Sequence, residues 1–76
     1  SGKEHLEEAI AKDTSDVELR FLRLTIQVNL PSFLGYSDDI ESDHKFVLAN
    51  LGDTEDQFFI NRVNGFLADA KKRGKL

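Results

Sequence analysis

The stretch that most constrains this chain is residues 17–30, VELRFLRLTIQVNL, because it carries two apolar stripes when drawn as an α-helix. At about 100° per residue, the first stripe contains Val17, Phe21, Leu24 and Val28. The second stripe, on the opposite side, contains Leu19, Leu22, Ile26 and Leu30. A helix with two apolar faces is expected to lie between neighbours, with Arg23, Gln27 and the other polar residues at its edges. On this interpretation Leu22 is in the middle of a buried stripe, and Leu22→Asp should abolish folding.

The alternative for residues 17–30 is a β-strand, because apolar residues alternate along both halves of the stretch. The alternation changes phase between Phe21 and Leu22, so a strand would need a bulge there. Ser15 and Glu18 have the spacing of a capping box, and Pro31 cannot continue a helix. We therefore expect a helix over residues 16–30.

Three further segments have helical patterns, over residues 3–12, 38–51 and 54–73. The first has a narrow apolar stripe. The second begins with Ser37 or Asp38 as its cap and ends at Gly52. The third begins with a capping box of Thr54 and Gln57 and ends before Gly74. The expected inner residues of the three segments are Leu6, Ala9, Ile10; Ile40, His44, Val47, Leu51, flanked by Leu48; and Phe59, Val63, Phe66, Ala70, widened by Ile60 and Leu67.

These segments predict an all-α fold, a small bundle of about four helices in a single domain spanning residues 1–76, with the helix 16–30 at its centre. Short connections favour an up-and-down or solenoid-like arrangement. Gly65, inside the last helix, suggests a close helix crossing or a kink. Ser1 and Gly2, without an initiator Met, look like a cleavage remnant, so the chain is expected to be a fragment of a longer one.

The loop after Pro31 is unusually apolar, with Phe33, Leu34 and Tyr36 around Gly35. Such a loop either plugs the end of the helical core or forms an exposed patch for a partner, and we favour the plug. Gly35 is expected to supply a backbone conformation that other residues avoid. Phe46 and Phe58 fall outside the inner stripes of their helices. The candidate interaction surface is therefore Phe33, Leu34, Tyr36, Phe46, Phe58.

Composition narrows the possible functions. The chain has 39% hydrophobic and 32% charged residues, which indicates a folded domain, and no apolar run is long enough to insert into a membrane. The absence of cysteine removes thiolate zinc sites and leaves the compartment open. A net charge of −4 argues against binding to nucleic acid or anionic lipid. Acidic residues near helix starts and basic residues at the end of the last helix complement the helix dipoles.

Little in the sequence points to chemistry. His44 is the one residue on an apolar face that could transfer protons, and with Glu41 it forms a Glu-x-x-His pair, the spacing used in di-metal bundles. Such bundles need a second pair; His5 and Glu8 are a weak one in reversed order. No calcium loop, phosphate loop, nucleophile elbow or zinc pattern is present. We therefore expect no catalytic residues, no metal, no cofactor and no enzymatic activity.

The stretch LEEAIAKDTSDVELRFL resembles the join between two tetratricopeptide repeats, with Ala9 at the small-residue position of a second helix and Thr14 where the repeat usually has proline. Over residues 6–51, including LRFLRLTIQVNLPSFLGYSDDIESDHKFV, the chain resembles a group of uncharacterised helical proteins from Bacteroidetes-type bacteria. That resemblance implies a helical bacterial protein, and it brings no activity or ligand.

The sequence thus predicts a non-enzymatic protein–protein interaction or scaffolding module. The alternative is a helical bundle that binds a small ligand or a metal through His44 and Glu41. A partner protein or a second copy of the chain is expected to cover the apolar residues outside the core, and we favour a symmetric homodimer.

Overall fold

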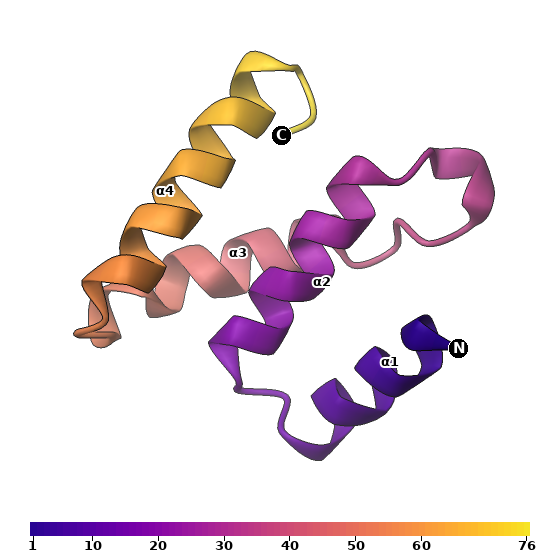
Figure 1. Cartoon of the computed structure of the whole chain (residues 1–76), viewed down its shortest axis with the longest axis horizontal. Coiled ribbons are helices and arrows are strands. Elements are labelled where there is room, and N and C mark those ends of the chain that lie inside the picture. The colour runs from indigo at the N-terminus through magenta and orange to yellow at the C-terminus, as the bar shows by residue number, and fades with distance from the viewer.

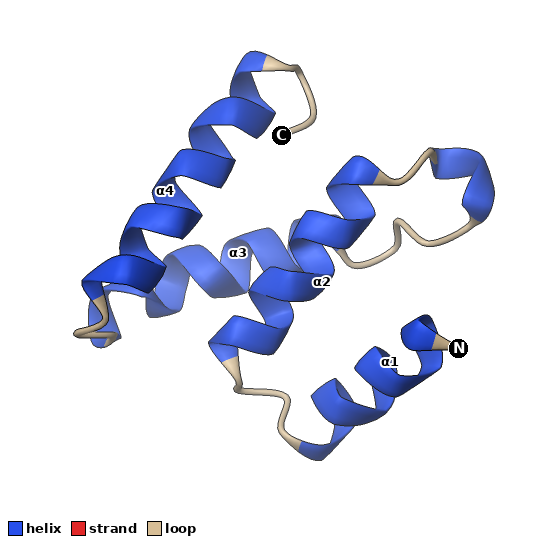
Figure 2. Ribbon diagram, viewed as in Figure 1, coloured by secondary structure: helices blue, strands red, loops and turns tan.

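The computed structural model describes residues 1–76 and contains helices and no strands (Figure 2). Four α-helices follow one another along the chain: α1 (Gly2–Lys12), α2 (Val17–Asn29), α3 (Ile40–Asn50) and α4 (Gln57–Lys72). Short 3₁₀ turns, η1 (Ser32–Leu34) and η2 (Leu51–Asp53), lie in the connections on either side of α3. The predicted all-α class and the four predicted helical segments are confirmed, with ends that differ by at most three residues.

α2 is the central helix, as predicted, because it packs against α1, α3 and α4 (Figure 1). α1 and α2 run in opposite directions as a hairpin, and α3 crosses α2 near its middle. The main core is built from α2, α3 and α4 and contains Phe21, Leu24, Val28, Val47, Phe59, Val63 and Ala70. Leu6 and Ile10 of α1 are buried outside that core.

The first apolar stripe of α2 is buried as predicted at Phe21, Leu24 and Val28 and partly buried at Val17, and the prediction for the second stripe is wrong. Leu22 is 45% exposed, while Leu19, Ile26 and Leu30 are only half-buried. Arg23 and Gln27, which we expected at the edges, are buried. α3 packs on the side of α2 that carries these two polar residues, because α3 offers them a carboxylate and a backbone N–H as partners.

Aspartates cap two of the helices, so the predicted capping boxes are wrong. Asp16 accepts from the N–H of Leu19 at 3.1 Å, and Asp56 accepts from the N–H of Phe59 at 3.1 Å. Ser15 instead donates to Asp13, and α3 has Asp39 rather than Ser37 or Asp38 at its cap position. An aspartate one residue before a helix accepts from the same N–H groups as serine or threonine, so neighbouring candidates compete.

Two of the glycines that were expected at turns or helix ends have a left-handed backbone conformation. Gly35 (φ 71°) and Gly74 (φ 73°) adopt the left-handed conformation, and Gly74 ends α4 with the paired bonds of a Schellman motif. Gly52 does not end α3 in this way, because the chain continues into η2. Gly65 is exposed and a side chain there would meet nothing within 4 Å, so the predicted close crossing is absent.

α4 presents the predicted inner face, whereas α3 does so only in part. Phe59, Val63 and Ala70 are buried, and Phe21 of α2 contacts the rings of Phe59 and Phe66 edge-to-face at centroid distances of 5.6 and 5.5 Å. In α3, Val47 is buried, Leu48 is 52% exposed, and the fully buried neighbour is Asp43. The buried residues of α3 are therefore one apolar side chain, Val47, and one charged side chain, Asp43.

The domain is thin, with extents of 34 × 32 × 17 Å. Its accessible surface of 5055 Å² compares with about 4,700 Å² expected for a folded monomer of its mass. The excess agrees with an α2 whose second face is incompletely covered. None of the helices has the length and apolar content needed to cross a membrane.

Candidate interaction surface

An open apolar groove of about 450 Å³ lies between α1, the second stripe of α2 and the loop that follows α2. Six of its eight lining residues are hydrophobic, and Lys3 carries the only charge among them. The lining residues are Gly2, Lys3, Leu6, Leu22, Ile26, Leu30, Leu34 and Tyr36. The "α1/α2 groove" below means this set.

The groove exists because α1 is too small to cover its side of α2. α1 has only two buried side chains, Leu6 and Ile10. The α2 stripe continues past them to Leu30, and Leu22 faces outward at the margin. An apolar stripe that repeats along a helix and remains open on one side is the surface on which another polypeptide element packs.

One part of the loop after Pro31 is buried and another part is exposed, so neither the plug nor the patch describes the whole loop. Tyr36 is buried and lines the groove, with Lys3 Nζ 4.7 Å from the centre of its ring. The predicted plug is wrong for Phe33 and Leu34, which are 83% and 54% exposed. Leu34 lines the groove, and Phe33 precedes it in the η1 turn.

The five predicted surface residues do not form one patch. Phe58 is 84% exposed at the start of α4, whereas Phe33, Leu34 and Tyr36 lie in the loop at the opposite end of the long axis (Figure 1). Phe46 is half-buried on α3, and the guanidinium of Arg20 lies 4.2 Å from its ring centre. The loop residues are therefore the part of the predicted surface that adjoins the groove.

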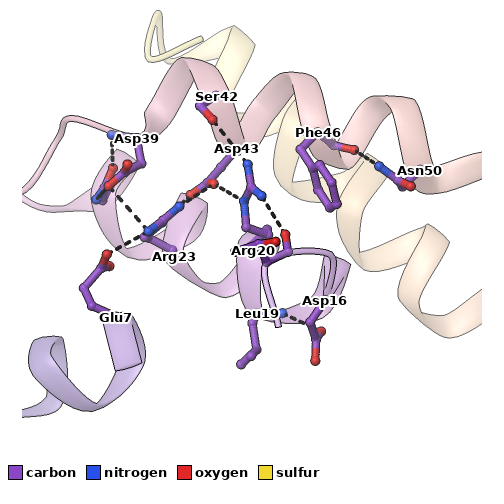
Figure 3. Close-up of polar contacts among 12 residues, drawn as sticks. Glu7, Asp16, Leu19, Arg20, Arg23, Asp39, Ser42, Asp43, Phe46 and Asn50 are labelled. Carbon is purple, nitrogen blue, oxygen red and sulfur yellow. Dashed lines mark hydrogen bonds and ion pairs between the residues drawn. The ribbon is translucent and has the colours of Figure 1, made fainter. Parts of the chain in front are cut away.

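A buried ion cluster beside the groove joins α2 to α3 (Figure 3). Asp43 is fully buried and accepts from two arginines. Arg23 Nε donates to Oδ2 at 2.7 Å, Arg23 Nη2 donates to Oδ1 at 2.9 Å, and Arg20 Nε donates to Oδ1 at 2.6 Å. Arg20 also donates to Ser42 Oγ and to the carbonyl of Thr14. Hydrogen bonds to Asp43 raise the pKa of Arg23, so this guanidinium stays charged despite its burial.

The same cluster reaches α1 and the loop. Arg23 Nη1 donates to Glu7 Oε1 at 2.8 Å, and the hydroxyl of Tyr36 donates to the other oxygen of Glu7. Burial, followed by the hydrogen bond to Glu7, raises the pKa of Tyr36 to about 12. Glu7 thereby connects α1 to α2 through Arg23 and to the loop through Tyr36.

Gln27 extends the cluster to the start of α3. Its Nε2 donates to Asp39 Oδ2 at 3.0 Å, and its Oε1 accepts from the backbone N–H of Asp39 at 2.9 Å. No buried side-chain nitrogen or oxygen in the chain lacks a hydrogen-bond partner. A satisfied network of this kind fixes the relative positions of the elements that it joins.

The sequence contains a pattern that is compatible with this cluster, although we expected the arginines at the edges of the central helix. Arg20 and Arg23 are spaced i, i+3, and Asp39 and Asp43 are spaced i, i+4, so each pair lies on one face of its helix. Two basic and two acidic residues on consecutive helices can pair when the helices cross. Which helix faces meet is a property of the fold, and periodicity in one helix does not reveal it.

Glu41 and His44, the residues of the metal-binding alternative, have different surroundings. Glu41 is exposed and pairs with Lys45 at 3.0 Å, and the hydrogen bond from Lys45 lowers the pKa of Glu41. His44 lines a different groove with Leu48, Leu67 and Lys71. No group of three or more His, Cys, Asp or Glu side chains in the chain could hold a metal ion.

No protein-family model, no curated protein and no solved structure matches this chain. The resemblances to a tetratricopeptide junction and to the Bacteroidetes group stay predictions.

Proposed function

We propose that this domain is a non-enzymatic protein–protein interaction module and that the α1/α2 groove is its docking face. The observation that carries the proposal is the incompletely covered second stripe of α2, from which exposed Leu22 and half-buried Ile26 and Leu30 line the groove. A contiguous apolar groove on a small domain is typical of a site that a partner covers.

In this proposal the polar groups around the groove have a structural role. Tyr36 and Lys3 are the lining residues with ionisable side chains, and the hydroxyl of Tyr36 is already bound to Glu7. The arginines and carboxylates behind the groove satisfy one another, so they hold its walls in place and leave the lining apolar. Such a surface suits recognition of apolar side chains.

A displayed library of amphipathic helical peptides tests the proposal directly. We expect selected peptides to bind the wild-type domain and to lose at least about tenfold in affinity against Leu22→Asp, because a charge at the groove margin must be desolvated on binding. Leu48→Asp is the matched control, since Leu48 is 52% exposed and lies outside the α1/α2 groove. Selected peptides that bind both variants equally, or a selection that yields no binder, would contradict the proposal.

The metal-binding alternative gains no support from the positions of Glu41 and His44. The partner is therefore expected to be a polypeptide.

A further inference from the structure

We infer that the polypeptide seated in the α1/α2 groove is a second copy of this chain, and that each copy places Phe33 in the groove of the other. This inference rests on the proposed function and names its partner. It follows from three properties of the same surface, which are its shape, its charge and its exposed area.

The surface carries both a projection and a recess. Phe33 is 83% exposed, so it occupies no recess in its own copy, and its neighbour Leu34 lines the groove. Figure 1 shows the η1 turn projecting at one end of the molecule. A two-fold contact requires the same patch to be complementary to itself, and an apolar projection beside an apolar recess meets that requirement.

The charge of the groove permits the approach of two acidic chains. Each copy has a net charge of −4, which would oppose association through most faces. Lys3 is the single charged residue of the groove lining, so two copies that meet there bring no carboxylates of the lining together. The acidic residues Asp38 and Glu41 border a separate surface hollow with Arg20 and Lys45.

The exposed area agrees with a weak dimer. An aromatic side chain buries about 150 Å² or more, so two Phe33 side chains and the groove residues that they cover supply several hundred Å² of apolar contact. Interfaces below about 1,200 Å² in total belong to weak or transient complexes. We therefore expect dissociation in the micromolar range. A partner helix lying along α2 would cover Leu22 without requiring Phe33, which makes Phe33 the residue that separates the two occupants.

Sedimentation equilibrium over a concentration series from about 1 to 500 micromolar measures the association. We expect a monomer–dimer equilibrium, and we expect Phe33→Ser to raise its Kd at least about tenfold. Phe58→Ser is the control, because Phe58 is 84% exposed at the far end of the molecule and should leave the Kd unchanged. Equal effects of the two variants would show that association is non-specific and would overturn the inference.

Crosslinking then tests which surfaces meet, and the absence of cysteine from the chain makes it selective. A Phe33→Cys copy is mixed with a Leu22→Cys copy and treated with a short bis-maleimide. The expected product is the mixed crosslinked dimer. The same mixture with Phe58→Cys in place of Phe33→Cys should give none, and equal yields from the two mixtures would contradict the inference.

Failure of this inference can be told apart from failure of the proposed function. A chain that stays monomeric at 500 micromolar, yet binds selected amphipathic peptides in a Leu22-dependent manner, rejects the second copy and keeps the docking groove. A monomer that binds no peptide rejects both.

Discussion

Arg23 and Asp43 form a two-point ion pair in the interior of the domain, with Nε 2.7 Å from Oδ2 and Nη2 2.9 Å from Oδ1. Arg23 comes from α2 and Asp43 from α3, so this pair fixes how the two helices cross. Through Glu7 the same guanidinium also holds α1, and α1 forms one wall of the groove. The geometry of the proposed docking face thus depends on a pair of charges that do not touch it.

Asp43→Ala should destabilise the domain strongly. The change leaves Arg23 buried without its main partner, and breaking a buried pair in this way costs about 3–5 kcal/mol. A chain of this length has a total stability of about 4–11 kcal/mol, so the variant should be partly unfolded at 37 °C. Urea denaturation measures the loss. The double variant Arg23→Met, Asp43→Leu should recover part of it, and a double variant no more stable than Asp43→Ala would contradict this account.

Stability should fall between about pH 10 and pH 12 because of Tyr36. The pKa of Tyr36 is raised to about 12 in the folded chain, against about 10 in the unfolded chain. In this window the folded state keeps a proton that the unfolded state has lost, so the contribution is complete below the unfolded pKa and decreases as pH rises. Urea midpoints of the wild type and Tyr36→Phe across the window isolate the effect, since the lysines are common to both. Parallel curves would show that Tyr36 does not contribute.

Leu22 and Leu24 should respond very differently to the same substitution. Leu24 is 0% exposed in the core, and Leu24→Asp should prevent folding, because it places an unpaired carboxylate there. Leu22→Asp should lower stability by less than about 1 kcal/mol, since Leu22 is 45% exposed and the charge can remain hydrated. This replaces the expectation drawn from the sequence. Thermal melting followed by circular dichroism compares the two, and a Leu22→Asp chain without a melting transition would show that the second stripe is buried after all.

Gln27→Leu should loosen the first turn of α3. The amide of Gln27 accepts from the N–H of Asp39, and an apolar replacement leaves that donor without a partner at a cost of about 1–3 kcal/mol. Hydrogen exchange should accelerate first at the start of α3. Gln57→Ala serves as the control, because Gln57 bonds only to exposed Asn61 and its loss should cost less than about 0.5 kcal/mol.

The aspartate caps can be separated from their neighbours by alanine substitution. Asp16→Ala and Asp56→Ala should each cost about 0.5–2 kcal/mol, because each removes the acceptor for a helix N–H. Ser15→Ala and Thr54→Ala should cost less, since these side chains bond within the preceding turns. Urea denaturation of the four variants decides the assignment. A larger loss for Ser15→Ala than for Asp16→Ala would restore the capping box predicted from the sequence.

The sequence by itself determined the helices and most of their core faces. Apolar residues repeat with a helical period in α2 and α4, and this period placed Phe21, Leu24, Phe59 and Val63 correctly in the interior. Pro31, Gly35 and Gly74 marked chain reversals because their backbone preferences are local. Such properties depend on residues close together in the chain, so they can be read without knowing what lies opposite.

Only the tertiary structure decided which face of α2 each neighbour covers. Leu22 and Arg23 are adjacent in sequence, and by hydrophobicity alone Leu22 should be inside and Arg23 outside. The reverse holds, because α3 crosses α2 where Asp43 can receive both arginines, while the short α1 leaves the second apolar stripe open. A buried charge is stable only when its partner is in place, and that partner lies 20 residues away along the chain. The burial of Arg23 and the open groove beside Leu22 are therefore set by the packing of whole helices, which no local pattern records.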